Sequence, residues 1–509
     1  MRVDFFNRTM VTITATAWFL CCAFTVNAQT RVSIGVTETI ETHNPYGDSV
    51  SLQYGIYSEV TGPFCTYNYA KGDFEGRLAE RWKIENPTTW IFFLSKNYKF
   101  NDGSAVTADD VVHSIMNRVI GDPQSKQKAS VAPSIVKADA VDKFTVKLTT
   151  DKPTAPLLSF LCDRLIVTSK AMFDKYGRDA ADREHMMGGG PYRLKELIPG
   201  QRLVLQKRPE HPDAKKNPRA PDEVVYRIMR ETEQRVTALL TDEIQIAQFI
   251  PPHLRQRVEK TANLRITPVD SVEIMFLAMQ PKPPFDKKEV RQAVCHAINR
   301  DQIIATLLEG FASRLDGPIG PGQYGYDPNL KPKMNYDPER AKKLLTQAGY
   351  PNGVDVELQT PVGRYTLDKQ LTEAMIPMLN AAGFRAKLAT PEWATLWANV
   401  QKGTVPFYYM GRGSVQDPSA ALHQYFHSGE TPRIGYANPK LDELLDKEQA
   451  ELDVKKRRQY LSQAMSILTD DAPACFLWRH KLLWGLNSKV EYKPLPDARI
   501  YAIDMAVKR

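Results

Sequence analysis

One arginine in the last third of the sequence has the chemistry to hold an acidic ligand. Arg364 follows the segment Thr360-Pro361-Val362-Gly363. A guanidinium group makes two parallel, charge-assisted hydrogen bonds to a carboxylate, and this fork fixes the orientation of the bound group. We therefore interpret Arg364 as a carboxylate-binding residue. The competing interpretation is a surface ion pair with Asp368, four residues further on.

A pair of histidines offers a second kind of chemistry. His423 and His427 are spaced i, i+4, which places both imidazoles on one face of a helix. A transition metal could bridge two such rings, but two histidines do not complete a metal site. The pair is either a solvated or cleft-edge feature or a weak candidate for recognising a metal chelate or haem. We predict no resident cofactor and no metal.

Sequence patterns of enzymes are missing. The chain contains no Gly-x-Ser-x-Gly elbow, no His-Glu-x-x-His and no Walker loop. Ser414, within Gly411-Arg412-Gly413-Ser414, has no histidine placed near it by any recognisable pattern. We predict that the protein is not an enzyme, although a secreted enzyme with a dispersed active site remains the alternative.

The elements that must position these residues can be predicted from their periodicity. Strands are expected at 350–359 and 385–389, on either side of a helix at 368–382. An earlier helix has clear start and stop signals, because Asp337 provides an N-cap, Pro338 occupies the first turn and Gly349 ends the helix. Arg364 is therefore expected in a loop between a strand and a helix.

The most informative segment for the fold is 76–119. It contains an aromatic strand at 90–94 and a turn at 101–103, followed by Thr107 at an N-cap position with Asp110 at the third helical position. Thr-x-x-Asp is a carboxylate version of the capping box. A helix with one apolar face is predicted from there to residue 119.

The N-terminus has the layout of a secretory signal peptide at residues 1–28. A weakly basic start precedes a short apolar region, and Val26-Asn27-Ala28 supplies small residues for a cleavage site. A membrane anchor is the alternative, but the apolar region is short for a span of about 20 residues. Lipid attachment at Cys21 or Cys22 is disfavoured because neither follows a small residue.

Composition indicates a large exported protein of more than one lobe. The chain has 509 residues, 42% of them hydrophobic, and a formal net charge of +8. Its basic residues do not form runs interleaved with aromatics, so we predict that nucleic acid is not a partner. Four cysteines follow the signal peptide, namely Cys65, Cys162, Cys295 and Cys475. Free buried thiols and one disulfide are both compatible with their wide spacing.

In order along the chain, several blocks resemble the family 5 extracytoplasmic solute-binding proteins, the peptide and nickel receptors of ABC importers. They include the 76–119 block, Gly188-Gly189-Gly190-Pro191-Tyr192, Pro284-Phe285-Asp286 and Ile298-Asn299-Arg300. The resemblance covers nearly the whole chain after the signal peptide. It implies an α/β, two-lobed periplasmic-binding-protein fold of type II, with an extra subdomain in lobe one and the ligand cleft between the lobes. The implied boundaries are 29–272 for lobe one, with 58–184 as the inserted subdomain, 273–474 for lobe two, and 475–509 as a return to lobe one.

The same resemblance implies a function. The chain would be the periplasmic substrate-binding component of an ABC importer, a monomer that captures a peptide or peptide-like solute by hinge closure. Its partners would be a membrane permease and ATPase. A receptor for an opine or other anionic conjugate, or for a nickel chelate or haem, is the alternative on the same fold.

The resemblance also implies a set of ligand contacts. Arg364 resembles the arginine with which dipeptide-binding relatives hold the terminal carboxylate. Trp393, within Glu392-Trp393, resembles the tryptophan that walls a side-chain pocket, with a core role as the alternative; Trp397 is interpreted as core. From lobe one, the lip around Asn44, Tyr46 and Ser49 is expected to contribute.

At one position the sequence departs from the pattern of peptide receptors. Those receptors carry an aspartate three residues before an acidic-Pro pair, where it neutralises the α-ammonium of the ligand. Here the pair is Asp417-Pro418 and the earlier position is Ser414, with Arg412 two residues before it. A hydroxyl cannot cancel a buried cationic charge. Either another acid, Asp48 or Glu41, meets the ammonium, or the ligand has none and is an opine-like conjugate or another anionic or polar solute. Asp417 itself either contacts ligand or caps the following helix.

Overall fold

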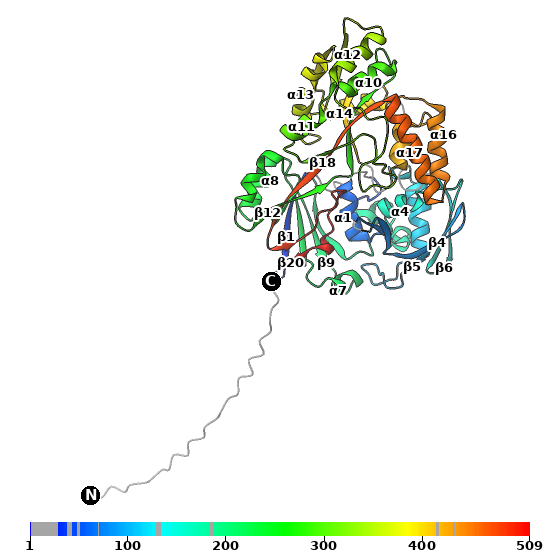
Figure 1. Ribbon diagram of the computed structural model, residues 1–509. Helices are drawn as coiled ribbons and strands as arrows, with labels where there is room; N and C mark the ends of the chain where they lie inside the picture. The colour runs from blue at the N-terminus through cyan, green and yellow to red at the C-terminus, as the bar shows by residue number, and fades with distance from the viewer. Residues whose placement is uncertain are drawn as a thin grey trace.

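The structure is a computed structural model that describes Met1 and residues 29–37, 43–47, 51–69, 71–128, 134–183, 188–413, 417–430 and 433–508. The predicted signal peptide therefore lies outside the described residues apart from Met1. Two α/β lobes are visible, one containing β1, β9 and β20 and the other containing α10, α12 and α13 (Figure 1). Among the described residues, no helix combines the length and apolar character needed to cross a membrane.

Lobe one is built around strands that flank β1. β1 runs parallel to β10 and β11, and β9 and β8 extend the sheet beyond β10. The elements of this lobe outside the inserted subdomain are β1 (Arg31–Val36), β8 (Tyr192–Ile198), β9 (Arg202–Lys207), α7 (Pro212–Lys216), β10 (Glu223–Ile228), α8 (Thr232–Leu240), β11 (Ile246–Ala247), η2 (Pro252–Leu254), α9 (Arg255–Glu259) and β12 (Leu264–Asp270).

The subdomain inserted between β1 and β8 has its own four-stranded sheet, in the order β4-β5-β7-β6, and a β2-β3 hairpin. A disulfide between Cys65 on β2 and Cys162 on α4 ties the hairpin to a helix. The elements are α1 (Ser51–Thr61), β2 (Cys65–Asn68), β3 (Asp73–Gly76), β4 (Ala79–Asn86), β5 (Thr89–Leu94), α2 (Ala108–His113), η1 (Ser114–Ile120), β6 (Ile135–Asp142), β7 (Thr145–Thr150), α4 (Leu157–Arg164), α5 (Lys170–Tyr176) and α6 (Arg178–Arg183).

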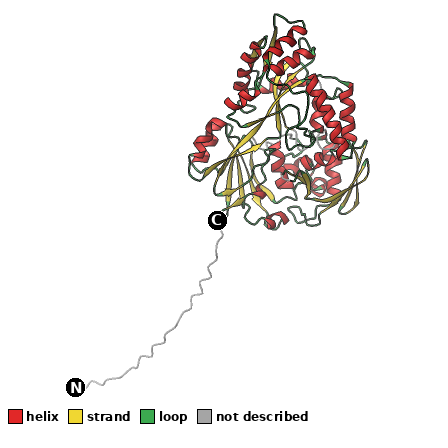
Figure 2. Ribbon diagram, in the orientation of Figure 1, coloured by secondary structure: helices red, strands yellow, loops and turns green. Residues whose placement is uncertain are grey.

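Lobe two places helices around strands β16-β15-β17-β13, with helices at the periphery and strands inside (Figure 2). Its elements are β13 (Glu273–Met279), α10 (Lys288–Ala297), α11 (Arg300–Thr306), β14 (Ala312–Arg314), α12 (Pro338–Gln347), β15 (Val354–Gln359), α13 (Asp368–Ala381), β16 (Phe384–Ala389), α14 (Trp393–Gln401), β17 (Phe407–Gly413), α15 (Ser419–Phe426), α16 (Pro439–Ala450) and α17 (Val454–Asp471).

The long strand β18 (Ala474–Asn487) runs through both lobes (Figure 1). Its first half pairs with β13 and β14 in lobe two, and its second half pairs with β11 and β12 in lobe one. The predicted return at residue 475 thus falls inside a strand: Trp478 still packs in the lobe-two core, and Trp484 packs in the lobe-one core. After β18 the chain stays with lobe one in β19 (Val490–Glu491), η3 (Ala502–Asp504) and β20 (Ala506–Val507).

Local predictions from capping and turn chemistry are largely confirmed. The backbone N–H of Thr107 donates to the Asp110 carboxylate at 2.9 Å in the predicted capping box, and Asp337 accepts from the N–H of Arg340 at 2.9 Å at the start of α12. One prediction was incomplete. The helix expected to run to residue 119 changes at Ser114 to the wider π-helix η1, which still buries Ile115 and Val119 completely.

Candidate ligand-binding site

The loop between β15 and α13 holds Arg364 on a rigid turn. The buried carboxylate of Asp368 accepts hydrogen bonds from the backbone N–H groups of Gly363, Arg364 and Tyr365 at 2.9 to 3.0 Å. Asp368 therefore fixes the main chain of Arg364, which is a different role from the surface ion pair considered as the alternative. The Arg364 side chain is exposed, and its guanidinium carbon lies 5.3 Å from the centre of the Trp393 ring.

Trp393 opens helix α14 and is only partly buried. Glu392 caps this helix, because its carboxylate accepts from the N–H groups of Ala394 and Thr395 at 2.7 and 3.2 Å. The Trp393 indole meets Tyr365 edge-on at 6.3 Å and stacks on Trp397 at 5.6 Å with an interplanar angle of 16°. The ring thus joins the core on one side and keeps exposed surface, as a pocket wall requires.

The stacked indoles lead to two further arginines. The guanidinium carbon of Arg433 lies 4.9 Å from the Trp397 ring centre and 5.3 Å from that of Tyr425. Arg412, at the end of β17, lies 5.6 Å from the same Tyr425 ring. We call the set consisting of Arg364, Trp393, Trp397, Arg433, Tyr425 and Arg412 the arginine–aromatic cluster. Cation–π contacts of this kind contribute about 0.5 to 2 kcal/mol each, depending on desolvation.

The arginine–aromatic cluster carries an excess of positive charge at Arg412 and Arg433. Among the described residues, Arg412 and Arg433 have no carboxylate within ion-pair distance, and the buried Nε atom of each has no hydrogen-bond partner. The pKa of Arg412 is lowered, first by burial and further by the neighbouring cations Arg164 and Arg433, although Tyr425 opposes this. Burying a cation without a counter-charge is unfavourable, so the cluster has an unmet requirement for negative charge.

Lobe one approaches the cluster through helix α4. Arg164 and Asp163 of this helix act electrostatically on Arg412. Asp163 is already in contact with two guanidinium groups, those of Arg164 at 2.8 Å and Arg499. Asp163 therefore opposes the lowering of the Arg412 pKa with a smaller effect than that of the two neighbouring cations. The lobes also touch directly, since the N–H of Ala155 donates to the carbonyl of Gln449 at 2.8 Å.

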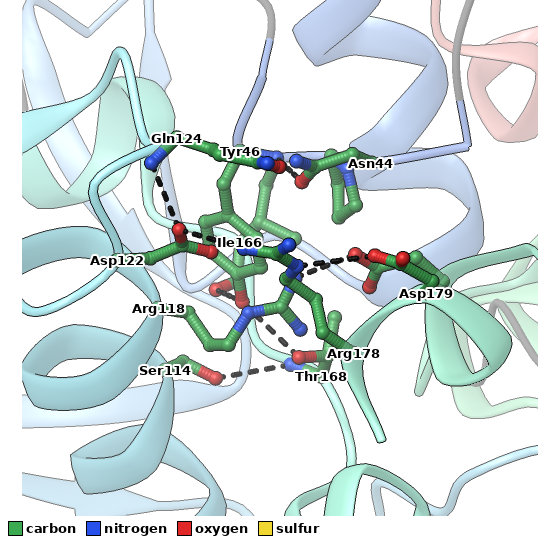
Figure 3. A network of polar contacts seen from close by, with 12 residues as sticks. Asn44, Tyr46, Ser114, Arg118, Asp122, Gln124, Ile166, Thr168, Arg178 and Asp179 are labelled. Carbon is green, nitrogen blue, oxygen red and sulfur yellow. Dashed lines mark hydrogen bonds and ion pairs between the residues drawn. The ribbon is translucent and has the colours of Figure 1, made fainter. Parts of the chain in front are cut away.

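The lobe-one lip has a structural organisation that the sequence did not reveal (Figure 3). The side-chain oxygen of Asn44 accepts from the N–H of Tyr46 at 3.0 Å and shapes the turn. Tyr46 has no exposed surface, its hydroxyl donates to the carbonyl of Ile166 at 3.1 Å, and Arg118 covers its ring at 4.5 Å. The predicted ligand contact by the Tyr46 side chain is therefore corrected to a packing role.

Several predicted residues cannot be placed. Ser49 and Ser414, together with Glu41 and Asp48, lie outside the described residues. Their roles stay predictions.

Asp417 holds the helix that follows it. Arg457 donates to both carboxylate oxygens at 2.6 and 2.8 Å, and the N–H of Ser419 donates to Asp417 at 3.0 Å. The same guanidinium binds Glu448, which has no exposed surface, at 3.0 Å. The N-cap of α15 is Pro418, and Asp417, one residue earlier, accepts from the first N–H of the helix and pairs with Arg457. Its assignment as a ligand contact stays a prediction.

The histidine pair has little capacity left for a metal. His423, His427 and Asp446 bring one potential ligand atom each to within 4.8 Å. However, Nε2 of His423 donates to the carbonyl of Leu445 at 3.1 Å, and Nδ1 of His427 accepts from the N–H of Gly429 at 3.1 Å. The second bond uses the lone pair of His427 and leaves its proton on Nε2, facing Asp446 at 3.5 Å. The arrangement is explained without a metal.

A pocket of about 630 Å³ lies elsewhere, in the inserted subdomain beside the network of Figure 3. Its charged side chains are paired within lobe one: Arg178 with Asp122 at 3.1 Å and with Asp179 at 3.1 Å, and Arg118 with Asp182 at 2.6 Å. This pocket has no unmet charge comparable to that of the arginine–aromatic cluster.

Sequence reasoning found Arg364, Trp393 and Arg412 but missed Arg433 and Tyr425. Trp397, interpreted as core, packs against the core of lobe two, and its half-buried ring also links Trp393 to Arg433. The i, i+4 spacing of the two tryptophans was a usable signal. No local pattern connects Arg433 with the others.

Two α/β lobes that share one strand, with an extra subdomain in the first, form the architecture of the periplasmic solute-binding receptors. The chain belongs to the bacterial extracellular solute-binding proteins, family 5, whose family model matches residues 73–433. The predicted family and fold class are confirmed. This family consists of solute-binding proteins rather than enzymes.

Three relatives illustrate the similarity. The chain is 28% identical over 444 residues to the probable D,D-dipeptide-binding periplasmic protein DdpA of Escherichia coli K12, covering 82% of each chain. It is 26% identical over 481 residues to the glutathione-binding protein GsiB of E. coli strain 536, covering 90% of each. A structure of MoaA from A. tumefaciens R10 with mannopinic acid superposes with a TM-score of 0.78 at 25% identity, covering 95% of this chain and all of that one.

Proposed function

We propose that this protein is the periplasmic receptor of an ABC importer and binds a peptide-like solute that carries a carboxylate. The ligands named for the three relatives are a D,D-dipeptide, glutathione and mannopinic acid, and all of these carry carboxylate groups. Closure of the lobes around the solute would present a loaded receptor to the membrane permease and its ATPase.

The observation that carries this proposal is the placement of Arg364. Its main chain is fixed by the buried Asp368, while its guanidinium stays exposed beside the ring of Trp393. A cation held on a rigid turn beside an aromatic wall is preorganised for a planar anion, because little conformational entropy is lost on binding. We assign Arg364 to the ligand carboxylate and Trp393 to the adjoining wall.

The proposal includes export and a simple stoichiometry. The segment 1–28 would direct the chain to the periplasm and be removed there. One monomer would bind one solute and return it unchanged, so mass spectrometry before and after incubation should detect no product. A metal chelate is not the favoured ligand, since His423 and His427 are engaged in hydrogen bonds, and His423→Ala should leave solute affinity unchanged.

Calorimetric titration with dipeptides, glutathione and opines tests the role of Arg364. Arg364→Ala should weaken binding by about 2 to 5 kcal/mol if the ion pair is desolvated in the closed protein. Arg385→Ala is the matched control, because Arg385 lies in the same lobe and pairs on the surface with Asp355 at 2.8 Å. An Arg364→Ala protein that binds as tightly as the Arg385→Ala control would refute the assignment.

A further inference from the structure

The two inner arginines of the arginine–aromatic cluster do not have the surroundings of structural arginines. Arg457, which is structural, contacts the carboxylates of Asp417 and Glu448. Arg412 and Arg433 instead lie on one ring, that of Tyr425, and have no carboxylate partner among the described residues. Two like charges that share one aromatic ring repel each other, and no carboxylate among the described residues pairs with either of them.

The undescribed sequence next to the two arginines contains no acidic residue. The sequence around the two arginines that the structure does not describe reads Ser-Val-Gln at 414–416 and Thr-Pro at 431–432, and neither stretch contains an acidic residue. From lobe one, Arg164 adds another cation, and Asp163 already contacts two guanidinium groups. Among the described residues, positive charge is therefore in excess around Arg412, although Asp163 partly opposes it.

Further contacts connect Arg412 and Arg433 with Arg364. Trp393 and Trp397 stack between Arg364 and Arg433, and the hydroxyl of Tyr365 donates to the carbonyl of Gly411, next to Arg412, at 3.1 Å. A solute whose carboxylate is held by Arg364 could thus direct a second group towards Arg412 and Arg433.

We propose that Arg412 and Arg433 form a second anion subsite, so that the solute carries two acidic groups and no free ammonium at this end. This inference rests on the proposed function and narrows its ligand class to dianionic, N-substituted amino acids or peptides. Bidentate hydrogen bonds from the two guanidinium groups would then replace the repulsion over Tyr425 with attraction to one shared anion.

Three probes that differ at the amino end test the subsite by calorimetry on the ligand-free protein. L-Alanyl-L-alanine places a cation there, its N-acetyl derivative a neutral amide, and its N-succinyl derivative a carboxylate. We expect the N-succinyl probe to bind at least about tenfold more tightly than the free dipeptide, because like charges placed together cost several kcal/mol. Tighter binding of the free dipeptide would overturn the proposal.

Substitutions test which residues cause the preference for the N-succinyl probe. Arg412→Gln and Arg433→Gln should each weaken the N-succinyl probe by about 30-fold, as expected when one partner of a desolvated charge pair is removed. Both substitutions should weaken the binding of the N-acetyl probe far less. Arg385→Gln serves again as the surface control and should keep the full preference. A preference that survives in both Arg412→Gln and Arg433→Gln would contradict the assignment.

Melting of the ligand-free protein gives a readout that needs no solute. Arg412→Gln should melt no lower than the wild type, since it removes repulsion, whereas Arg457→Gln should melt several degrees lower. Equal losses in both would show that Arg412 is structural and overturn the subsite. If none of the probes binds, the peptide-like scaffold of the proposed function fails. Citrate should then still stabilise the wild type more than Arg412→Gln at matched ionic strength, and equal stabilisation of the two would reject the subsite as well.

Discussion

At the scale of single residues, the molecule contains arginines in two contrasting environments. Arg457 is buried between Asp417 and Glu448, and its pKa is raised by both carboxylates although burial acts against this. Arg412 is held over Tyr425, and its pKa is lowered by burial and by its cationic neighbours. The environment of Arg457 is that of a structural ion pair, and the environment of Arg412 is the one we propose for binding an anionic ligand.

Removal of the structural arginine should be costly. Arg457→Gln leaves two carboxylates close together, with Glu448 fully buried. We expect the free energy of unfolding to fall by about 3 to 5 kcal/mol, the range for breaking a buried pair on one side. Denaturant titration measures this loss. Arg458→Gln, on the neighbouring position, is the control, and a loss no greater than that of the control would disprove the structural role.

Buried histidines should make the protein sensitive to acid. Burial lowers the pKa of His480 to about 4, and neither ring nitrogen has a hydrogen-bond partner in the described part of the chain. Because the pKa in the folded state lies below the usual 6.5, the unfolded chain binds more protons between these values, and stability falls as the pH drops from about 6.5 to about 4. His480 alone could account for a loss of up to about 3 kcal/mol in the free energy of unfolding over that pH interval.

His480→Phe should therefore flatten the acid side of the stability profile, as followed by chemical denaturation at several pH values. His253 is exposed, and His253→Phe should leave the profile as it is. If the profile of His480→Phe coincides with that of the wild type, His480 does not contribute to acid sensitivity.

At the scale of elements, sequence and structure agree where the determinants are local. Thr107 with Asp110, and Asp337 with Pro338, mark helix starts that need only neighbouring residues, and the structure has both. Arg364 could be placed in the loop between strand and helix for the same reason. Arg433 and Tyr425 could not be placed in this way, because their contacts join segments that are far apart in the sequence: Arg433 meets Tyr425 of α15 and Trp397 of α14.

The disulfide is an element-scale feature that spacing alone left open. Cys65 and Cys162 are 97 residues apart, so the bond closes a long loop within the inserted subdomain. In the chain-entropy view such a loop contributes about 4 to 5 kcal/mol, and measured values for disulfides are about 2 to 4 kcal/mol. The double substitution Cys65→Ser with Cys162→Ser should lower the free energy of unfolding by about 2 to 5 kcal/mol.

Thiol counting provides the control for that experiment. Cys295 and Cys475 are free and buried in lobe two. The denatured, unreduced protein without its signal peptide should thus react with two equivalents of a thiol reagent, and the reduced protein with four. Four reactive thiols before reduction would show that the bond between Cys65 and Cys162 does not form.

At the scale of the whole molecule, the lobes are connected by β18, by the short link from β12 to β13 and by a few contacts. β18 belongs to both, and Ala155 meets Gln449 across the junction. A shared strand can bend while each lobe keeps its own core, so closure around a solute is compatible with this connection. The arginine–aromatic cluster lies in lobe two next to Arg164 of lobe one, and closure would therefore desolvate a bound anion and strengthen its ion pairs.

Native mass spectrometry of the protein isolated from the cells that export it, followed by denaturation and identification of the released molecule, tests this account most directly. We predict one small molecule per chain with two acidic groups, and its loss when Arg364→Ala and Arg412→Gln are combined. A cationic or neutral molecule, or an acidic one that the double variant retains undiminished, would contradict the account.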